Sequence, residues 1–350
     1  MMRISSLTRK KLRQFTRIKR GWYAFILLAF MIFFACGAEL FINSRALIVH
    51  YQGSWYFPTY GNMIPGQVFG LEYAYETNYQ ELSDIFRSQN TGNWVLMPLV
   101  PYNAFENDLR PDTLPPDPPS LSRRHFLGTD IAGRDVLARL VYGFRIAIFF
   151  SLGLLVVTYG IGITAGCAMG YYGGWFDILV QRLIEIWTTV PLLYVVMIIS
   201  SIVIPGFWWL IAIMALFGWM TMTWTIRTVT YREKTRDYVL AARVLGASDL
   251  RIIFRHILPN TLSLIITYVP FSISSGIAGL TSLDYLGFGL QPPTPSWGEL
   301  LQQAGSNLSL SAWWIGFAII TALVVTLVAV TFVGEAIREA FDPKQHTVYE

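Results

Sequence analysis

Hydrophobic positions along the chain gather into six continuous apolar runs with polar segments between them. The runs cover residues 22–42, 144–169, 183–204, 208–229, 261–283 and 312–333. Each is close to the roughly 20 residues that an α-helix needs to cross the hydrocarbon core of a bilayer. Strands of a membrane barrel would instead be segments of about ten residues with alternating polarity. The pattern therefore predicts an all-α integral membrane protein with six transmembrane helices.

The polar segments divide the chain into five parts. Residues 1–21 form a basic N-terminal segment, 22–42 the first transmembrane helix, and 43–143 a large insertion that ends in an interfacial helix. Residues 144–333 form a five-helix core with a polar loop at 230–260, and residues 334–350 form a C-terminal tail.

Basic residues are distributed unevenly among these segments. Residues 1–20 hold eight Lys and Arg with no acidic residue, the loop at 230–260 holds six, and the loop at 284–311 holds none. Because cytoplasmic loops of membrane proteins are enriched in Lys and Arg, this asymmetry predicts cytoplasmic N- and C-termini and an outer location for 43–143. The net charge of +4 then reflects topology and contact with anionic lipid, and it does not indicate nucleic-acid binding.

Composition agrees with this class of protein. Only 14% of the residues are charged, against about 25% in soluble domains. The first run is longer than the 7–15 apolar residues of a signal peptide and lacks an A-x-A site, which favours an uncleaved helix. Cys36 and Cys167 both fall inside predicted spans, so we expect two small buried hydrophobes with neither a disulfide nor a metal site.

The segment 43–122 is the unusual part of the insertion. It holds eight acidic residues and many aromatic ones, and it ends in a Pro-rich stretch at 110–121 that is typical of an extended spacer. The aromatic content argues against full disorder. Two interpretations stay open, namely a folded cap over the membrane bundle and a docking surface for a delivery protein or for cationic substrates.

The segment 125–146 leads into the second span. Thr129 or Asp130 can cap a helix, and from Val136 the apolar positions follow helical spacing. This pattern fits an amphipathic helix at the membrane surface or a simple lead-in turn. The acidic residues near span ends, Glu39 and Glu185, are interpreted as interfacial helix ends.

The sequence of the loop around residues 237–260 predicts two short helices joined at a glycine. Asp237 can cap the first helix, Gly246 suits the left-handed conformation that ends it, and Ser248 can cap the second. The second helix has an apolar face made by Leu250, Ile253, Phe254 and Ile257.

Small residues in the first helix, Ala241 and Ala242, permit close approach of another backbone. Such a helix can insert into a groove of a partner protein, or the loop can pack against its own bundle. Pro259 is tolerated in the first turn of the span that follows.

The fifth span is the most polar of the six. Its small polar residues serve either close helix packing or a hydrogen-bonding transport path. The candidates for lining such a path are Ser263, Thr267, Ser272, Ser274 and Ser275.

The loop at 237–259 resembles a motif of a known family. Ala241, Ala242, Gly246 and the run His256-Ile257-Leu258-Pro259 have the spacing of the EAA motif of ABC importer permeases. Leu240 stands at the family's leading Glu position, so an acidic anchor is not expected there.

Three further stretches resemble the C-type subunit of the dipeptide/oligopeptide permease branch. They cover residues 283–301, 334–344 and 125–144; the last has Phe126 where the branch commonly has Pro, and its motif residues are Gly128, Thr129, Asp130, Gly133, Arg134 and Asp135. The insertion, with GSWYFP at 53–58, is similar to the Yej-type permease, which is linked to oligopeptide and microcin C uptake.

The resemblance implies a type I ABC importer fold in the bacterial inner membrane. It implies a B-type sister permease, one or two ATPase subunits (fused or separate) that bind ATP and Mg²⁺, and a periplasmic or lipid-anchored peptide-binding protein. The residues that would couple to the ATPase are Asp237, Ala241, Ala242, Gly246, His256, Leu258 and Pro259. The chain has no G-x-x-x-x-G-K-[ST] run, so it is not expected to bind ATP itself.

Two other classes of membrane protein compete with the importer subunit. A channel or secondary transporter would show charged or broken helices at the membrane midplane. A membrane enzyme would have to use His50 or His125, and neither lies in a recognisable motif. The loop at 237–259 favours the importer subunit.

Overall fold

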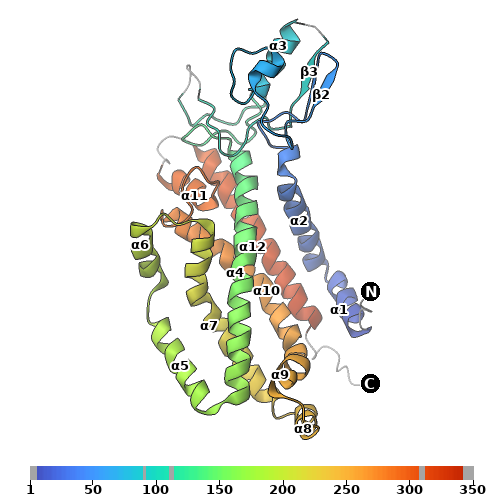
Figure 1. The fold of residues 1–350 in the computed structure, drawn as a ribbon, viewed down its shortest axis with the longest axis vertical. Coiled ribbons are helices and arrows are strands. Elements are labelled where there is room, and N and C mark those ends of the chain that lie inside the picture. The colour runs from blue at the N-terminus through green and yellow to red at the C-terminus, as the bar shows by residue number, and fades with distance from the viewer. Residues whose placement is uncertain (1–5, 90–91, 110–113, 307–311, 342–350) are drawn as a thin grey trace.

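A computed structural model describes residues 6–89, 92–109, 114–306 and 312–341. Figure 1 shows a bundle of long helices with a small domain, here called the insertion domain (residues 43–122), at one end. The helices α8 and α9 lie at the other end of the bundle. We call these the insertion end and the loop end.

Five continuous helical stretches in the described residues are long and apolar enough to cross a membrane. They are α2 (Lys19–Cys36), α4 (Val136–Tyr172), α7 (Phe207–Glu233), the stretch Asp249–Tyr285, and α12 (Trp313–Phe341). A sixth span is formed if α5 (Gly174–Thr188) and α6 (Leu192–Ile202) are counted together. The predicted membrane-spanning helical architecture is confirmed.

The third span is not the straight helix that its apolar run predicts. Its two halves, α5 and α6, meet at an angle of 69°. Pro191 is the N-cap of α6, and proline both lacks an N–H donor and disfavours helical geometry in the residue before it. The break therefore lies where the sequence places its proline.

The second span begins earlier than its apolar run indicates. Helix α4 runs unbroken for 37 residues from Val136, so residues 136–143 form neither a separate interfacial helix nor a lead-in turn. The expected cap was also wrong, because the carboxylate of Asp135 accepts the hydrogen bond from the backbone N–H of Ala138 at 2.7 Å. Thr129 and Asp130 lie in the loop before it, where their side chains have other partners.

Helices α4 and α7 pack closely along one face of α4. Gly162, Gly166 and Gly170 recur there every fourth residue, and a Cβ atom on Gly166 would lie 2.6 Å from the carbonyl oxygen of Thr223. Small residues at this spacing let two membrane helices approach closely. This pair forms the centre of the bundle (Figure 1).

The N-terminal helices pack on the last one. Helix α1 (Ser6–Arg17) and α2 contribute Phe15 and Leu28 to an apolar cluster with Val330 and Ala336 of α12. Of the two cysteines, Cys167 is buried as expected, but Cys36, the last residue of α2, is exposed.

The insertion domain has its own core. Strands β1 (Ile48–Tyr51), β2 (Ser54–Tyr56) and β3 (Trp94–Leu96) form an antiparallel sheet in the order β2-β1-β3. Helix α3 (Tyr79–Gln89) packs Leu82 and Phe86 against Val49. Short 3₁₀ turns lie at Ala38–Leu40 and Gly66–Phe69. The aromatic residues of this segment thus serve a folded domain within an otherwise helical protein.

The Pro-rich end of the insertion domain is partly outside the described residues, since 110–113 are not included. The described remainder is pinned to the loop that precedes α4. Asp117 exchanges two hydrogen bonds with Thr129, of 2.9 Å from the Thr129 N–H and 2.8 Å to its hydroxyl. This part of the stretch is therefore packed and does not act as a free spacer.

Candidate functional site

The loop at the loop end contains the first helix that the sequence predicts. Helix α8 (Asp237–Val244) begins at Asp237, but Arg236 occupies the capping position, so Asp237 does not cap it. Gly246 has a φ of +79°, the left-handed conformation expected of it. Ser248 precedes α9 (Asp249–Ile252), although its hydroxyl makes no capping hydrogen bond.

The second predicted helix is not separate from the fifth span. Helix α9 continues through a π-helical turn (Ile253–Ile257) into α10 (Leu258–Tyr285). Pro259 lies just after that turn, and its missing N–H explains why the regular hydrogen-bond ladder is interrupted there. His256 is half-buried within the turn, Leu258 is half-buried, and Pro259 is exposed.

The loop has a buried face and an exposed face. Val239 and Ala242 of α8 pack with Ile252, Ile253 and Ile257 against α4 and α7. Leu250 and Phe254, which were expected on one face with Ile253 and Ile257, are exposed instead. The wider π turn changes the angular period and separates these residues.

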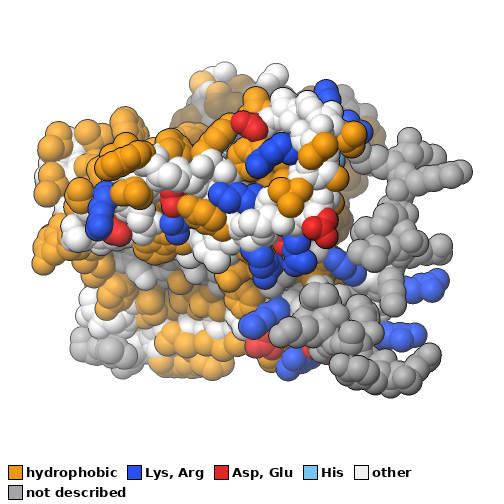
Figure 2. Space-filling view, turned by 90° about the horizontal axis from the view of Figure 1, so that it is seen from below, with side chains coloured by type: hydrophobic (Ala, Val, Ile, Leu, Met, Phe, Trp, Pro, Cys, Tyr) orange, Lys and Arg blue, Asp and Glu red, His pale blue; other side chains and the backbone are white. Residues whose placement is uncertain are grey.

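The tip of α8 is the most exposed apolar feature of this loop. Val244 and Leu245 are 86% and 87% exposed, and Ala241 is also exposed. Only Ala242 of the two small residues faces the protein's own bundle. The loop thus packs on its bundle through one side and presents an apolar tip on the other. Figure 2, which looks onto the loop end, shows Lys and Arg side chains gathered on this face.

Polar contacts hold the loop to its bundle. The hydroxyl of Tyr171, in α4, donates to Asp249 at 2.7 Å, and Arg243 of α8 donates to the same hydroxyl at 3.2 Å. Nearby, Asp177 of α5 accepts hydrogen bonds from Arg227 at 2.6 Å and from Tyr231 at 2.8 Å. These bonds link α8 and α9 to α4, and α5 to α7.

A cavity of about 330 Å³ lies between α4, α7 and α10 in the middle of the bundle. Two of the five candidates for path lining, Ser272 and Ser275, line it. Tyr159 of α4 also lines it, and its hydroxyl lies 2.8 Å from that of Ser272.

The other three candidates lie outside this cavity. The hydroxyl of Ser263 accepts a hydrogen bond from Lys11 at 2.8 Å, and Thr267 donates to the carbonyl of Ser263 at 2.8 Å. The hydroxyl of Ser274 is buried and has no hydrogen-bond partner among the described residues.

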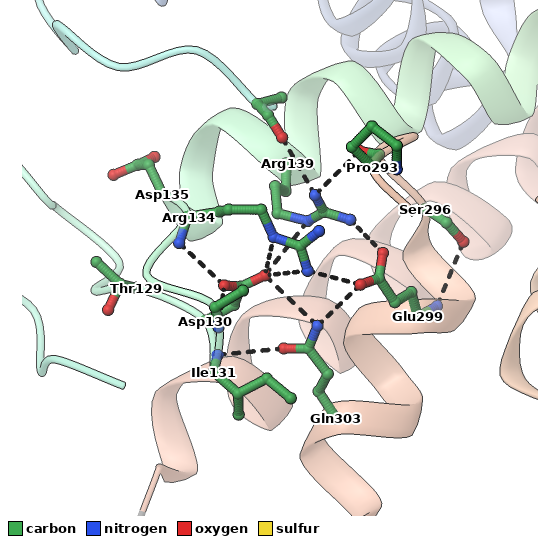
Figure 3. Close-up of polar contacts among 12 residues, drawn as sticks. Thr129, Asp130, Ile131, Arg134, Asp135, Arg139, Pro293, Ser296, Glu299 and Gln303 are labelled. Carbon is green, nitrogen blue, oxygen red and sulfur yellow. Dashed lines mark hydrogen bonds and ion pairs between the residues drawn. The ribbon is translucent and has the colours of Figure 1, made fainter. Parts of the chain in front are cut away.

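The motif of unassigned role at 128–135 takes part in a buried charge cluster at the insertion end (Figure 3). Arg134 bonds to Asp130 at 2.7 Å and to Glu299 of α11 (Trp297–Ser306) at 2.6 Å. Arg139 of α4, which is fully buried, also pairs with Glu299 and lies 3.6 Å from Asp130. Two cations and two anions therefore balance, and Gln303 bridges the two carboxylates.

The electrostatics of Arg134 reflect this pairing. Burial alone would lower the pKa of its guanidinium, but the hydrogen bonds with Asp130 and Glu299 outweigh burial and leave the pKa raised. Such a network joins the loop before α4 to α11 without leaving an unpaired charge.

The glycines of this motif have steric roles. Gly128 has a φ of +72°, and a Cβ atom there would lie 2.7 Å from both the carbonyl oxygen of Asp117 and the indole nitrogen of Trp314. Gly133 also has a positive φ, of +80°. The motif therefore shapes a tight loop that packs on α12.

His125 connects the insertion domain to α4. The sequence pattern predicted no role for this residue. Its ring nitrogens lie 2.8 Å from Asp135 and 3.1 Å from Asp108, and Tyr102 stacks on the ring at 3.9 Å between centroids. Burial opposes protonation, but the two carboxylates outweigh it and raise the pKa of His125.

The two acidic residues near span ends each form an ion pair. Glu39 pairs with Arg145 of α4 at 2.6 Å, and Glu185 pairs with Arg182 at 2.6 Å. Over the described residues, no group of three or more His, Cys, Asp or Glu side chains could hold a metal ion.

Arg139, Glu299, Gln303 and His125 were not selected from the sequence. Arg139 and Glu299 could have been noticed because a charge within or beside an apolar run needs a partner. Their partners lie in distant segments, however, and spacing alone does not reveal them.

The fold and the loop define a class, the membrane-embedded subunits of binding-protein-dependent importers. A family model described as "Binding-protein-dependent transport system inner membrane component" matches residues 162–347. The chain belongs to this family and is a multi-pass permease subunit of an ABC importer, of the Yej type.

Curated relatives agree over most of the chain. It is 40% identical over 345 residues to the inner membrane ABC transporter permease protein YejE of Escherichia coli K12, covering 99% of each chain. It is 36% identical over 363 residues to the peptidoglycan transport system permease protein YejE of Agrobacterium fabrum, covering 97% of this chain and 94% of the relative. It is 32% identical over 292 residues to the dipeptide transport system permease protein DppC of Haemophilus influenzae, covering 78% and 97%.

Proposed function

We propose that this permease subunit conducts peptides inward across the bacterial inner membrane, driven by a separate ATPase that engages the loop at 237–259. The observation that carries the proposal is the exposed tip of α8. Val244 and Leu245 are exposed apolar side chains next to the left-handed turn at Gly246. A short apolar helix of this kind suits a groove in a partner protein.

The bundle supplies the means to transmit movement from that tip. Tyr171 joins both α8 and α9 to α4 through hydrogen bonds, and α9 is continuous with α10. A displacement of α8 therefore reaches α4 and α10, two of the helices that line the central cavity. In this proposal ATP and Mg²⁺ are bound by the partner ATPase, and its closure switches the access of the cavity from one side to the other.

The relatives support the substrate class that we propose. Similar proteins are named as peptidoglycan and dipeptide transport permeases, and oligopeptides or microcin C-like peptides are the substrates that we propose for this chain. A B-type sister permease, one or two ATPase subunits and a peptide-binding protein complete the transporter. Both termini and the loop end lie in the cytoplasm, consistent with the Lys and Arg on that face (Figure 2).

Reconstitution tests this function. The chain, expressed with its genomic neighbours, should co-purify with an ATPase and a second permease, and proteoliposomes should accumulate peptide only with ATP. A variant with Val244 and Leu245 both replaced by Ser should insert but lose the ATPase during purification. Leu121→Ser, at an exposed residue of the insertion domain (80%), is the matched control and should retain it. Active transport by the chain alone would reject the proposal.

A further inference from the structure

Two neighbouring pockets of opposite charge lie on the insertion domain. One has a volume of about 520 Å³ and the other about 470 Å³. Both are within the range of about 300–1,000 Å³ that small-ligand sites occupy. Gln80 and Tyr102 line both pockets and so form the ridge between them.

The first pocket carries an excess of negative charge. Its one arginine, Arg45, is matched by Glu76, with which it makes two contacts of 2.7 and 2.8 Å. Two more carboxylates line the same pocket, Glu106 and Asp108. Asp108 is already paired with His125 at 3.1 Å, so the excess charge is that of Glu106. Glu106 accepts a hydrogen bond from Ser44 at 2.8 Å and forms no ion pair within the described residues. Its burial raises the pKa of its carboxyl, and this effect outweighs the opposing hydrogen bond from Ser44.

A buried tyrosine, Tyr79, also lines this pocket. Tyr79 is only 2% exposed, and its hydroxyl meets no hydrogen-bond partner among the described residues. Thr77, two residues before it, donates its own hydroxyl proton to the carbonyl of Ile64. An unpartnered buried hydroxyl is costly, and its oxygen can accept a hydrogen bond from a ligand N–H group.

The second pocket carries an excess of positive charge. Three arginines line it, Arg87, Arg123 and Arg124, against one acidic residue, Asp84. Arg123 lies 3.4 Å from Asp117, whereas Arg87 and Arg124 form no ion pair in the part of the chain that the structure describes. Arg124 has a φ of +59°, an uncommon left-handed conformation for a side chain of this size. Strained backbone of this kind is concentrated at binding sites.

The ridge between the pockets is fixed in place. The amide of Gln80 donates to the carbonyl of Pro101, and the hydroxyl of Tyr102 donates to the carbonyl of Arg123 at 2.9 Å. Tyr102 also stacks on His125. The separation of the two charged pockets is therefore a rigid property of the domain.

We propose that the two pockets together bind the charged ends of a free peptide. The ammonium group lies beside Glu106, and the carboxylate is bound by Arg87 and Arg124. A short free peptide carries one positive and one negative end, and two adjacent pockets of opposite sign can hold one end each. The middle of a folded partner's chain carries neither terminal charge. This inference rests on the proposed peptide-transport function. It assigns to that function a receiving site, which is the place on this chain where an incoming peptide binds first.

The test uses the intact transporter without its binding protein and four tripeptide probes. They are Ala-Ala-Ala, its N-acetylated form, its C-amidated form and the form blocked at both ends. Each single block should weaken binding about tenfold, because each removes one charge-assisted contact. Calorimetry or a fluorescence competition assay in detergent gives the four affinities.

Two variants make the test specific to each pocket. In Glu106→Gln the penalty of N-acetylation should disappear while that of C-amidation persists. In Arg87→Gln the reverse should hold. A merely misfolded domain would weaken all four peptides by the same factor. Glu72→Gln, an exposed carboxylate of the same domain outside both pockets, is the matched control and should keep both penalties.

Two outcomes overturn the proposal. Either the wild-type transporter binds all four peptides equally, or each variant loses both penalties together. If ATP-driven peptide uptake persists alongside either of these, the receiving site alone is refuted. If uptake is absent from the reconstituted transporter while the two penalties are observed, the proposed function is refuted and the site stands as a peptide-binding site.

Discussion

The hydroxyl of Tyr171 lies 2.7 Å from a carboxylate oxygen of Asp249, and this one contact joins the end of α4 to the start of α9. Arg243 reaches the same hydroxyl from α8 at 3.2 Å. A single side chain of the bundle therefore positions both halves of the loop that we propose as the coupling element.

Replacing Tyr171 with Phe should loosen this attachment without disturbing the bundle. The ring keeps its apolar contacts, and the change removes hydrogen bonds that contribute roughly 1 kcal/mol each. We expect peptide uptake to fall several-fold while ATP hydrolysis continues, measured in proteoliposomes of the whole transporter. Tyr172→Phe, at the adjacent exposed residue (53%), is the control. Equal effects of the two changes would contradict the role given to Tyr171.

Gly246→Val should disrupt the turn between α8 and α9 through backbone strain alone. A Cβ atom there would meet nothing within 4 Å, but the φ of +79° disfavours a β-branched residue by roughly 1–2 kcal/mol. We expect the chain to insert normally and the yield of ATPase-bound complex and peptide uptake to fall together. Gly246→Asn should remain close to wild type, because Asn tolerates the left-handed region. Wild-type uptake by the Val variant would remove Gly246 from the mechanism.

His125 should make the stability of the insertion end depend on pH. The pKa of His125 is raised from 6.5 in the folded protein. Its contribution is therefore fully present below pH 6.5 and is lost as the pH rises through the folded-state pKa. The melting temperature, followed by Trp fluorescence between pH 6 and 9, should fall with rising pH more in the wild type than in His125→Gln. Asp108→Asn should shift the midpoint of that fall to lower pH, and an unchanged midpoint would contradict the pairing.

Removing one charged residue from the buried cluster at the insertion end should strongly destabilise the folded protein. Arg139→Met leaves Glu299 with one partner fewer in a buried site, and such a loss costs about 3–5 kcal/mol. We expect little folded protein by fluorescence-detected size exclusion. The double change Arg139→Met with Glu299→Leu removes one charge of each sign and leaves Asp130 paired with Arg134 at 2.7 Å. It should recover part of the folded yield, and a double variant worse than the single one would contradict the charge balance.

Ser275→Leu should obstruct the central cavity. Ser275 lines that cavity and is exposed to it, so a larger side chain reduces the space for a peptide. We expect uptake to fall several-fold with normal complex assembly. Ser274→Ala is the matched change at a neighbour outside the cavity, where loss of an unpartnered buried hydroxyl should raise stability by about 1 kcal/mol and leave uptake unchanged.

The helical architecture could be predicted from sequence because long apolar runs have few alternatives in a bilayer. The predictions of helix caps failed where several neighbouring residues are of a suitable type. Asp135 caps α4 although Thr129 and Asp130 are equally suitable residue types, because only Asp135 directly precedes the helix. The turn at Gly246 was predicted correctly, since few residues other than glycine adopt its conformation readily.

The candidate sites were less accessible to sequence reasoning. Leu250 and Phe254 were assigned to one apolar face with Ile253 and Ile257, but they are exposed while the two isoleucines are buried, because the π turn beside Pro259 changes the helical period. The charge cluster joins Arg134 and Glu299 across 165 positions, and a pattern of neighbours cannot reveal such a pair. The two pockets of the insertion domain likewise depend on residues from α3, β3 and loops that lie far apart in the sequence.

Helix α4 carries a mechanical consequence of its own. It runs unbroken for 37 residues, about 55 Å at the rise of an α-helix. At one end Asp135 is bonded to His125 beneath the insertion domain, and at the other Tyr171 is bonded to the coupling loop. Because α4 is a continuous helix that is bonded at both ends, a tilt at the loop end also moves the insertion end. In the proposed mechanism, peptide binding at the insertion end and ATPase binding at the loop end therefore act on the same helix.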